Sequence, residues 1–299
     1  MNAWLHILAA LVLAPLVPGI VNRVKARMSG RVGKPLLQTY FDLAKLTRKG
    51  LVESHTSSAM LAIGPAVSLA AICGALCLLP GPASPAPAGF AGDFMLAAYC
   101  LGLSRLAIIL AALDTGSSFE GMGASREAAF SALAEPVLFL ALLALAVDAP
   151  SLSLSGMLGQ GLSGALAPER LFVPLLLFIL LLTENCRIPV DDPNTHLELT
   201  MIHEVMVLDH SGPDMAMISY GAALKLWFFA AAVTLSLLPV QAMPPLAAWA
   251  AFLAGIVLTA VAVGLVESSM ARLRLLRVPR LLGSAGALAA LSLVLTVWR

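Results

Sequence analysis

Long apolar stretches alternate with short polar connections along the chain. An apolar run of about 20 residues can cross the hydrocarbon core of a bilayer as a helix. This pattern predicts eight spanning helices, over Ala3–Val21, Ala59–Leu79, Phe94–Leu113, Ala129–Val147, Leu171–Val190, Met215–Leu238, Leu246–Val266 and Leu281–Trp298. The first stretch has its basic residues after it and contains Pro15 and Pro18, so it is expected to be a spanning helix and not a cleaved leader. The fold class predicted is an all-α polytopic membrane bundle.

One connection has the pattern of a helix that lies along the membrane surface. At about 100° per residue, the apolar side chains of Pro35–Lys49 share one face and its polar side chains the other. The apolar face comprises Leu36, Leu37, Tyr40, Phe41, Leu43 and Ala44, and the polar face comprises Gln38, Asp42, Lys45 and Lys49. Such a helix sits at the headgroup boundary. It serves either as a simple anchor or as a ledge on which a partner docks.

A second helix that does not span is predicted over His196–His210. Thr195 with Glu198 three residues later matches a capping box at its start, and Ser211-Gly212-Pro213 is expected to end it. His196, His203 and His210 recur every seven residues, and two helical turns separate neighbouring histidines by about 10 Å. Side chains so far apart cannot share one ion, so no metal site is expected. A polar face turned toward a partner or a water-filled cavity is favoured.

The composition supports the membrane assignment. Of the 299 residues 60% are apolar and 12% are charged, whereas a soluble domain has about 45–50% and about 25%. We therefore expect one integral-membrane domain, residues 1–299, surrounded by lipid. The net charge of +1 argues against nucleic acid as a partner. The four cysteines have no C-x-x-C spacing, so this chain alone is expected to hold no metal or cluster; they are Cys73, Cys77, Cys100 and Cys186.

The distribution of Lys and Arg predicts the orientation of the bundle. The connections after the first and seventh helices are strongly basic, carrying Arg23, Lys25, Arg27, Arg31, Lys34, Lys45, Arg48 and Lys49 in the first and Arg272, Arg274, Arg277 and Arg280 in the second. Residues 80–92 and 149–166 contain no basic residue. Because basic connections stay in the cytoplasm, both termini are predicted to face away from it, as in a multi-pass protein of a bacterial inner membrane.

Several ionisable side chains lie within or beside the predicted spans. Each costs free energy in a bilayer, so each is a candidate for function. A lateral proton path is one interpretation, and its candidate residues are Arg105, Asp114, Glu135, Glu184, His203, Glu204 and Lys225. The alternative is that buried ion pairs, Arg105–Glu135 and Glu184–Arg187, only fix the register of the helices.

Three segments resemble a known family. GRVGKPLLQTYFDLAKLTRK (30–49), SREAAFSALAEP (125–136) and TENCRIPVDDPNTHLELTMIHEVMVLDHSG (183–212) are similar to the loops of subunit 1 of the proton-pumping NADH:quinone oxidoreductases. The third is most similar to the branch of membrane subunits of energy-converting nickel–iron hydrogenases, such as formate hydrogenlyase and hydrogenase-4. With eight helices in matching order, the resemblance covers essentially the whole chain.

The resemblance implies a membrane anchor and coupling subunit without an active site of its own. It places Glu135 and Glu184 at the family's buried proton-path glutamates. Partners would be hydrogenase large and small subunits and a ferredoxin-like subunit on the cytoplasmic side, which would carry the iron–sulfur clusters and the nickel–iron centre, and antiporter-like membrane subunits moving protons or sodium. Contact with this redox arm is expected through Arg31, Gln38, Asp42, Lys45, Arg126, Glu127, Arg187, Asp191, Asp192 and His196.

Departures from the quinone-reducing members favour the hydrogenase branch. Those members carry an acid-rich third loop and an acid in the sixth helix, whereas this chain has His196, His203 and Glu204 in the loop and Lys225 in the helix. A quinone-binding subunit of a respiratory enzyme remains the alternative. A stand-alone transporter would show an internal repeat, which this sequence lacks, and a scaffold without proton traffic would need its buried acids to be inert.

Overall fold

The apolar stretches fold as helices because a backbone in lipid must satisfy its hydrogen bonds within each segment. The computed structural model describes residues 3–52, 57–147, 149–158, 168–191 and 201–298. Its named elements are all helical: α1 (Trp4–Leu13), α2 (Leu16–Met28), α3 (Gln38–Leu46), α4 (Ala59–Leu78), α5 (Asp93–Asp114), α6 (Ser118–Val147), α7 (Leu154–Leu158), α8 (Pro168–Glu184), η1 (Glu204–Val207), α9 (Gly212–Leu237), η2 (Val240–Ala242), α10 (Pro245–Ser269), η3 (Leu275–Arg277) and α11 (Val278–Trp298).

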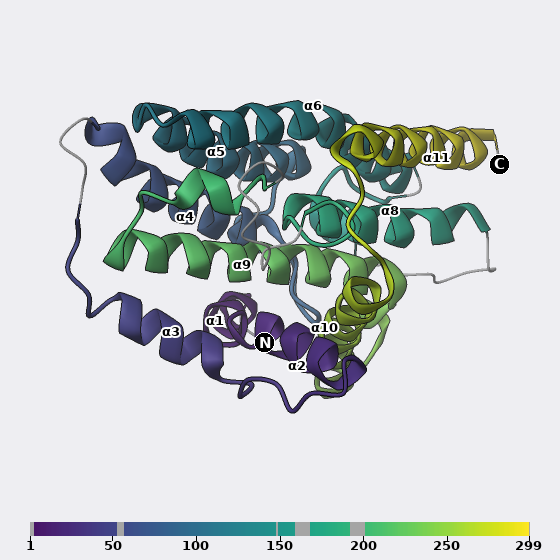
Figure 1. The fold of residues 1–299 in the computed structure, drawn as a ribbon. Helices are drawn as coiled ribbons and strands as arrows, with labels where there is room; N and C mark the ends of the chain where they lie inside the picture. The colour runs from purple at the N-terminus through teal and green to yellow at the C-terminus, as the bar shows by residue number, and fades with distance from the viewer. Residues whose placement is uncertain (1–2, 53–56, 148, 159–167, 192–200, 299) are drawn as a thin grey trace.

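The helix α9 is the axis of the bundle. In Figure 1, α4, α5, α6, α8 and α11 lie on one side of α9, and α1, α2, α3 and α10 lie on the other. Nearly all of α9 from Leu224 to Ser236 is buried, and its Trp227 and Phe229 are among the largest fully buried side chains in the described structure. An apolar helix that is covered all round is expected at the centre of a bundle.

The all-helical membrane fold is confirmed, whereas the count of eight spans is not. Six helices (α4, α5, α6, α9, α10 and α11) are long and apolar enough to cross a bilayer, and the pair α1 and α2, bent by 45°, forms a seventh candidate. The predicted span Leu171–Val190 corresponds to the shorter helix α8, which ends at Glu184. Cys186, just beyond that end, has a positive φ of 47°, which no α-helix contains.

The bend between α1 and α2 has an identifiable cause. Pro15 has no N–H to give to the Leu11 carbonyl one turn earlier. The Tyr220 hydroxyl of α9 donates to Leu11 O over 2.8 Å, and the Tyr40 hydroxyl of α3 donates to Val12 O over 2.5 Å. Two side chains from other helices therefore satisfy carbonyls at the break and attach α3 to the bundle.

The helix predicted over Pro35–Lys49 is present over a shorter length, as α3 (Gln38–Leu46), which contacts α2 and α9, whereas its place along the membrane surface stays a prediction. It buries no residue, and its Phe41 side chain remains 59% exposed. An amphipathic helix whose apolar side chains are uncovered by its own chain suits either of the two roles expected for it, a membrane anchor or a docking ledge.

The predicted helix over His196–His210 is wrong in its described part. Residues 201–210 contain only the single 3₁₀ turn Glu204–Val207. Ser211-Gly212-Pro213 does not end a helix but begins α9, with Ser211 at the N-cap and Pro213 in the first turn. Proline is favoured in the first helical turn because its missing N–H would be unpaired there anyway. Residues 192–200, with Thr195, His196 and Glu198, lie outside the described residues.

The connection predicted between the third and fourth spans is mostly helical. Only Thr115–Ser117 separates α5 from α6, and α6 runs 30 residues from Ser118 to Val147. Glu120 and Glu127 therefore lie in the first part of α6 and are buried. The hydrophobic pattern did not predict the first part of α6, because this part contains both polar and apolar side chains. It nevertheless packs against η1.

Candidate functional site

Arg105 is the centre of a buried cluster of charges. It projects from the middle of α5, and its Nη2 donates to both carboxylate oxygens of Glu184 at the end of α8, at 2.9 and 3.0 Å. The Nζ atom of Lys225 on α9 lies 3.2 Å from Glu184 Oε2. One carboxylate at the end of α8 is thus paired with cations from two other helices, a geometry in which a buried ion pair is fully compensated.

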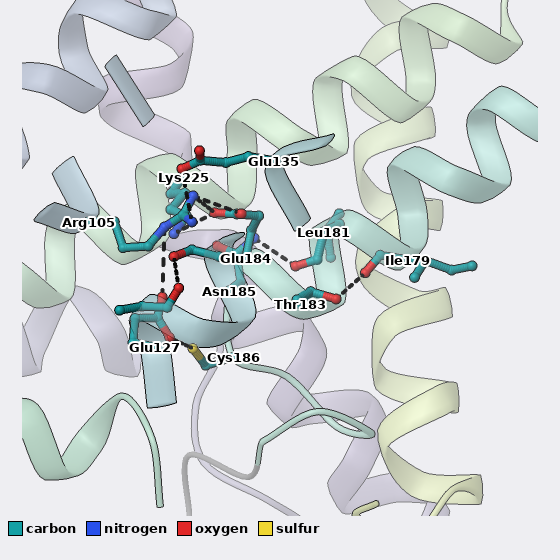
Figure 2. Close-up of polar contacts among 12 residues, drawn as sticks. Arg105, Glu127, Glu135, Ile179, Leu181, Thr183, Glu184, Asn185, Cys186 and Lys225 are labelled. Atoms are coloured by element: carbon teal, nitrogen blue, oxygen red, sulfur yellow. Dashed lines mark hydrogen bonds and ion pairs between the residues drawn. The ribbon is translucent and has the colours of Figure 1, made fainter. Parts of the chain in front are cut away.

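Two further carboxylates from α6 approach the same guanidinium. Glu135 Oε1 lies 3.5 Å from Arg105 Nη1, and Glu127 Oε1 lies 3.9 Å from Arg105 Nε. Figure 2 shows Glu127 and Glu135 on opposite sides of Arg105 and Glu184. The cluster therefore holds three carboxylates and two cations, with one negative charge in excess when all are ionised. Binding one proton would neutralise it.

The members of the cluster differ sharply in exposure. The Glu184 side chain is 5% exposed, whereas that of Glu135 is 48% exposed. Glu127 is also buried, and its Oε2 accepts a weak hydrogen bond from the Cys186 thiol at 3.8 Å. The cluster therefore reaches from the interior of the bundle to the outer face of α6 at Glu135.

A small polar cavity adjoins the cluster. It has a volume of about 60 Å³ and is bordered by Arg105, Glu127, Glu184, Lys225 and His203, among others. A water molecule in the liquid takes about 30 Å³, and a buried water needs two to four polar partners. The cavity thus has room for buried water between the carboxylates. On its far wall, the hydroxyls of Ser68 and Ser104 are hydrogen-bonded at 2.8 Å.

His203 borders this cavity from the segment that precedes α9. Burial, together with the positive charge of Lys225, lowers its pKa to about 4. The imidazole is therefore neutral near pH 7, and it can accept or donate a hydrogen bond there without storing a proton.

The segment that carries His203 is held in place by polar contacts. Asp191 Oδ2 accepts from the backbone N–H of Ile202 at 3.0 Å and of His203 at 3.3 Å, and Asp191 Oδ1 lies 2.8 Å from Arg272 Nη2. Arg126 Nη1 donates to the Met201 carbonyl at 3.0 Å. These contacts fix the wall of the cavity although the segment has little regular structure.

The structure brings together five of the seven proposed proton-path residues: Arg105, Glu135, Glu184, Lys225 and His203. Asp114 is elsewhere, where its carboxylate accepts from Ser58 N and Leu61 N and caps α4. Glu204 begins η1 and is partly buried. A proton-path role for these two residues stays a prediction.

Of the two ion pairs expected under the purely structural alternative, one is present and the other is not. The pair Arg105–Glu135 is present. The pair Glu184–Arg187 is wrong, because α8 ends at Glu184 and Arg187 is no longer one helical turn away. Arg187 Nη1 lies instead 3.4 Å from Glu267 Oε1 on α10.

The residues expected at the redox-arm interface fall into two groups. Arg31, Gln38, Asp42 and Lys45 lie on or beside α3 and are not buried, and Gln38 Nε2 donates to Asp42 at 2.8 Å. The other group, Arg126, Glu127, Arg187 and Asp191, makes contacts inside the chain. Asp192 and His196 lie outside the described residues. The interface itself stays a prediction.

Sequence reasoning missed some contributors to the site. Cys186 was considered as a possible metal or cluster ligand, yet its thiol contacts Glu127. Ser68 and Ser104 carry no signal in the sequence, because serine is common in spanning helices. Glu267, a charge near the end of an apolar stretch, was noticeable, but its partners Lys25 and Arg187 come from distant segments.

Comparison with known proteins agrees with the fold and with the resemblance in the loops. The family model described as NADH dehydrogenase matches residues 1–298. Hydrogenase-4 component C of Escherichia coli K12 is 33% identical over 216 residues, covering 72% of this chain and 68% of that protein. Formate hydrogenlyase subunit 4 of the same organism is 29% identical over 295 residues, covering 94% of each.

Among solved structures, a chain of the membrane-bound sulfane sulfur reductase, an archaeal respiratory membrane complex, superposes with a TM-score of 0.83. The match covers 98% of both chains at 22% identity. At that identity the likeness shows a shared fold.

Proposed function

The chain belongs to the NADH dehydrogenase family, and from that premise we propose that it is the membrane anchor and coupling subunit of a membrane-bound hydrogenase complex of the formate hydrogenlyase type. In this role it catalyses no reaction itself. It holds a cytoplasmic redox arm on the membrane and converts the redox state of that arm into protonation changes at the Arg105 cluster.

The observation that carries this proposal is the cluster with its excess carboxylate. A purely structural arrangement would balance its buried charges, because an uncompensated ion in a bilayer is costly. Within the described part of the chain, Glu127, Glu135 and Glu184 form ion pairs with two cations, Arg105 and Lys225, beside a cavity with room for water. Such a site suits reversible protonation more than anchoring alone.

The exposure of Glu135 indicates where the proposed proton path leaves the cluster. Its side chain is 48% exposed on α6, one of the candidate spans, so in an isolated chain this carboxylate would meet lipid. A charged group at such a place is expected to face a water-filled cavity or another protein. We infer that Glu135 faces a neighbouring membrane subunit, to which the cluster passes its proton.

The alternative of a quinone-binding subunit is less well supported at this site. Small-molecule pockets usually measure about 300–1,000 Å³, whereas the cavity beside Arg105 measures about 60 Å³. The cavity suits water molecules and is too small for a quinone ring. The family model alone is compatible with either branch.

The complex purified through this chain tests the branch. We expect it to contain nickel and to evolve H₂ from a low-potential electron donor. Reduction of added quinone without nickel would assign the chain to the respiratory branch and refute the hydrogenase proposal.

Glu135→Gln tests the proton path separately. The amide keeps the shape of the side chain but cannot release a proton, so we expect normal assembly and H₂ evolution with at least tenfold weaker ion transport into vesicles. Asp209→Asn, at an exposed acid before α9, is the matched control and is expected to behave as the unmodified protein. Equal transport by both variants would rule out Glu135 as a proton carrier, even in a complex that contains nickel.

A further inference from the structure

A second, larger cavity opens on the surface, and the segments that line it are distant in sequence from Arg105. It forms where the end of α2 and the following loop meet the end of α10, and its volume is about 650 Å³. Polar and apolar side chains both line it, and the polar ones include Lys25, Arg31, Lys34, Ser268 and the buried carboxylate of Glu267. Nothing in the proton path uses this cavity.

The charges around it leave two cations available. Lys25 Nζ lies 2.7 Å from Glu267 Oε2, and Arg187 adds a second contact to that carboxylate, so Glu267 is compensated. Within the residues that the structure describes, neither Arg31 nor Lys34 makes an ion pair, and both are exposed. The cavity therefore presents unpaired positive charge at its rim.

The loop that carries these cations is held in a defined shape. Arg23 Nη1 donates to the Val32 carbonyl at 2.8 Å and contacts the Lys34 carbonyl at 3.5 Å. Gly33 has φ of +72°, and a Cβ atom there would lie 2.5 Å from the Ala26 side chain, so the loop packs closely on α2. Arg31 and Lys34 are thus presented from a fixed backbone.

Apolar side chains are exposed beside the cations. Met28 is 58% exposed and lines the cavity, and Val32, between the two cations, is 84% exposed. Cations next to uncovered apolar side chains, at the ends of two spanning helices, match an amphiphile with an anionic head. The lining has no aromatic residue, which argues against a quinone ring.

We propose that this cavity binds the phosphate headgroup of an anionic phospholipid, with Arg31 and Lys34 contacting the phosphate and Met28 and Val32 lying against the start of the acyl chains. Basic pockets between spanning helices on the cytoplasmic side bind such headgroups. An acidic protein segment would satisfy the cations but would leave Val32 and Met28 uncovered. The site holds the first helix to the lipid around it, independently of the Arg105 cluster.

Native mass spectrometry of the delipidated complex, titrated with single lipids, tests the proposal. We expect phosphatidylglycerol and cardiolipin to bind more tightly than phosphatidylethanolamine. A cation near the membrane surface contributes about fivefold to binding, so Arg31→Gln with Lys34→Gln should weaken the anionic lipids about 30-fold, and Lys34→Gln alone about fivefold. Arg277→Gln with Arg280→Gln, which removes two exposed cations outside the lining of this cavity, is the matched control and should leave binding unchanged.

Other outcomes would overturn the proposal. If the double variant and the control bound lipid equally well, the cavity would not be a lipid-binding site. If inorganic phosphate bound as tightly as the lipids, the natural ligand would be a soluble anion and not a lipid. If the double variant instead lost peripheral subunits while it kept its lipid, the occupant would be a protein segment. Thermal unfolding of both variants at the unmodified temperature would establish that each is folded.

Discussion

At the scale of single residues, Arg105 holds the polar interior together. Its guanidinium contacts Glu127, Glu135 and Glu184, and without it Lys225 would be the one cation left in the cluster among the residues described. Removing one partner of a buried pair typically costs about 3–5 kcal/mol, because an uncompensated charge is left behind. We therefore expect Arg105→Gln to lower the free energy of unfolding in detergent by roughly that amount.

A second substitution separates the charge from the packing. If Arg105→Gln lowers the free energy of unfolding because it leaves a carboxylate unpaired, then adding Glu184→Gln should restore part of that free energy. The double variant should therefore lose less stability than the two single variants lose in sum. Strict additivity of the two unfolding free energies would contradict an ionic origin.

His203 predicts how stability depends on pH. Its pKa is lowered to about 4 in the folded chain, from an ordinary value of 6.5, chiefly by burial. Between these two values the unfolded chain binds a proton that the folded chain does not, so stability is full above pH 6.5 and falls as the pH drops toward 4. The contribution is at most about 3 kcal/mol.

Thermal unfolding across pH 4–8 measures this contribution. His203→Gln should flatten the fall between about pH 6.5 and pH 4. Burial also lowers the pKa of His210, so part of the slope should survive in that variant. An identical pH profile with and without His203 would show that its imidazole does not titrate in this range.

At the scale of elements, a glycine on α6 determines how the cavity wall sits. A Cβ atom at Gly123 would clash with Val205 Cγ1 and lie 2.8 Å from the Ile202 carbonyl, whereas one at Gly121 would meet nothing within 4 Å. The backbone of residues 202–205 therefore lies directly against α6, and only glycine allows this approach.

The two glycines make a matched pair of variants. We expect Gly123→Ala to push the segment with His203 outward and to lower stability by about 1–3 kcal/mol, together with a loss of coupled ion transport. Gly121→Ala should be neutral or stabilising by up to about 1 kcal/mol, because alanine is the better helix former. Equal unfolding temperatures for the two variants would show that this close packing is unimportant.

At the scale of the whole molecule, the apolar stretches predicted most of the helices within a few residues. For example, Ala59–Leu79 became α4 (Ala59–Leu78), because lipid requires long apolar segments to be helical. The segment before α9 was mispredicted, because its backbone is held by Asp191 and Arg126 from elsewhere in the chain and not by local propensity. Arg105, Glu135, Glu184 and Lys225 were identified as charges within the predicted spans, but their pairing depends on helix packing that no local pattern contains.

The number of crossings decides on which side each terminus lies. The helix α8 has 17 residues, about 26 Å at 1.5 Å per residue, slightly less than the hydrocarbon core of about 30 Å. A short span is accommodated by local thinning of the bilayer. If α8 crosses and the bent pair of α1 and α2 crosses once, there are eight crossings in total and both termini lie on the same side. The basic connections predict that this side faces away from the cytoplasm.

Single cysteines introduced on a background without the native four can report this topology. We expect a membrane-impermeant thiol reagent, added to intact cells, to label a cysteine at Trp298 and one at Ser84, in the neutral connection between α4 and α5, but not one at Ser29 after α2. Labelling at Ser84 without labelling at Trp298 would mean seven crossings and would remove α8 from the spans. In that case α8, which ends at Glu184, would enter the membrane without crossing it.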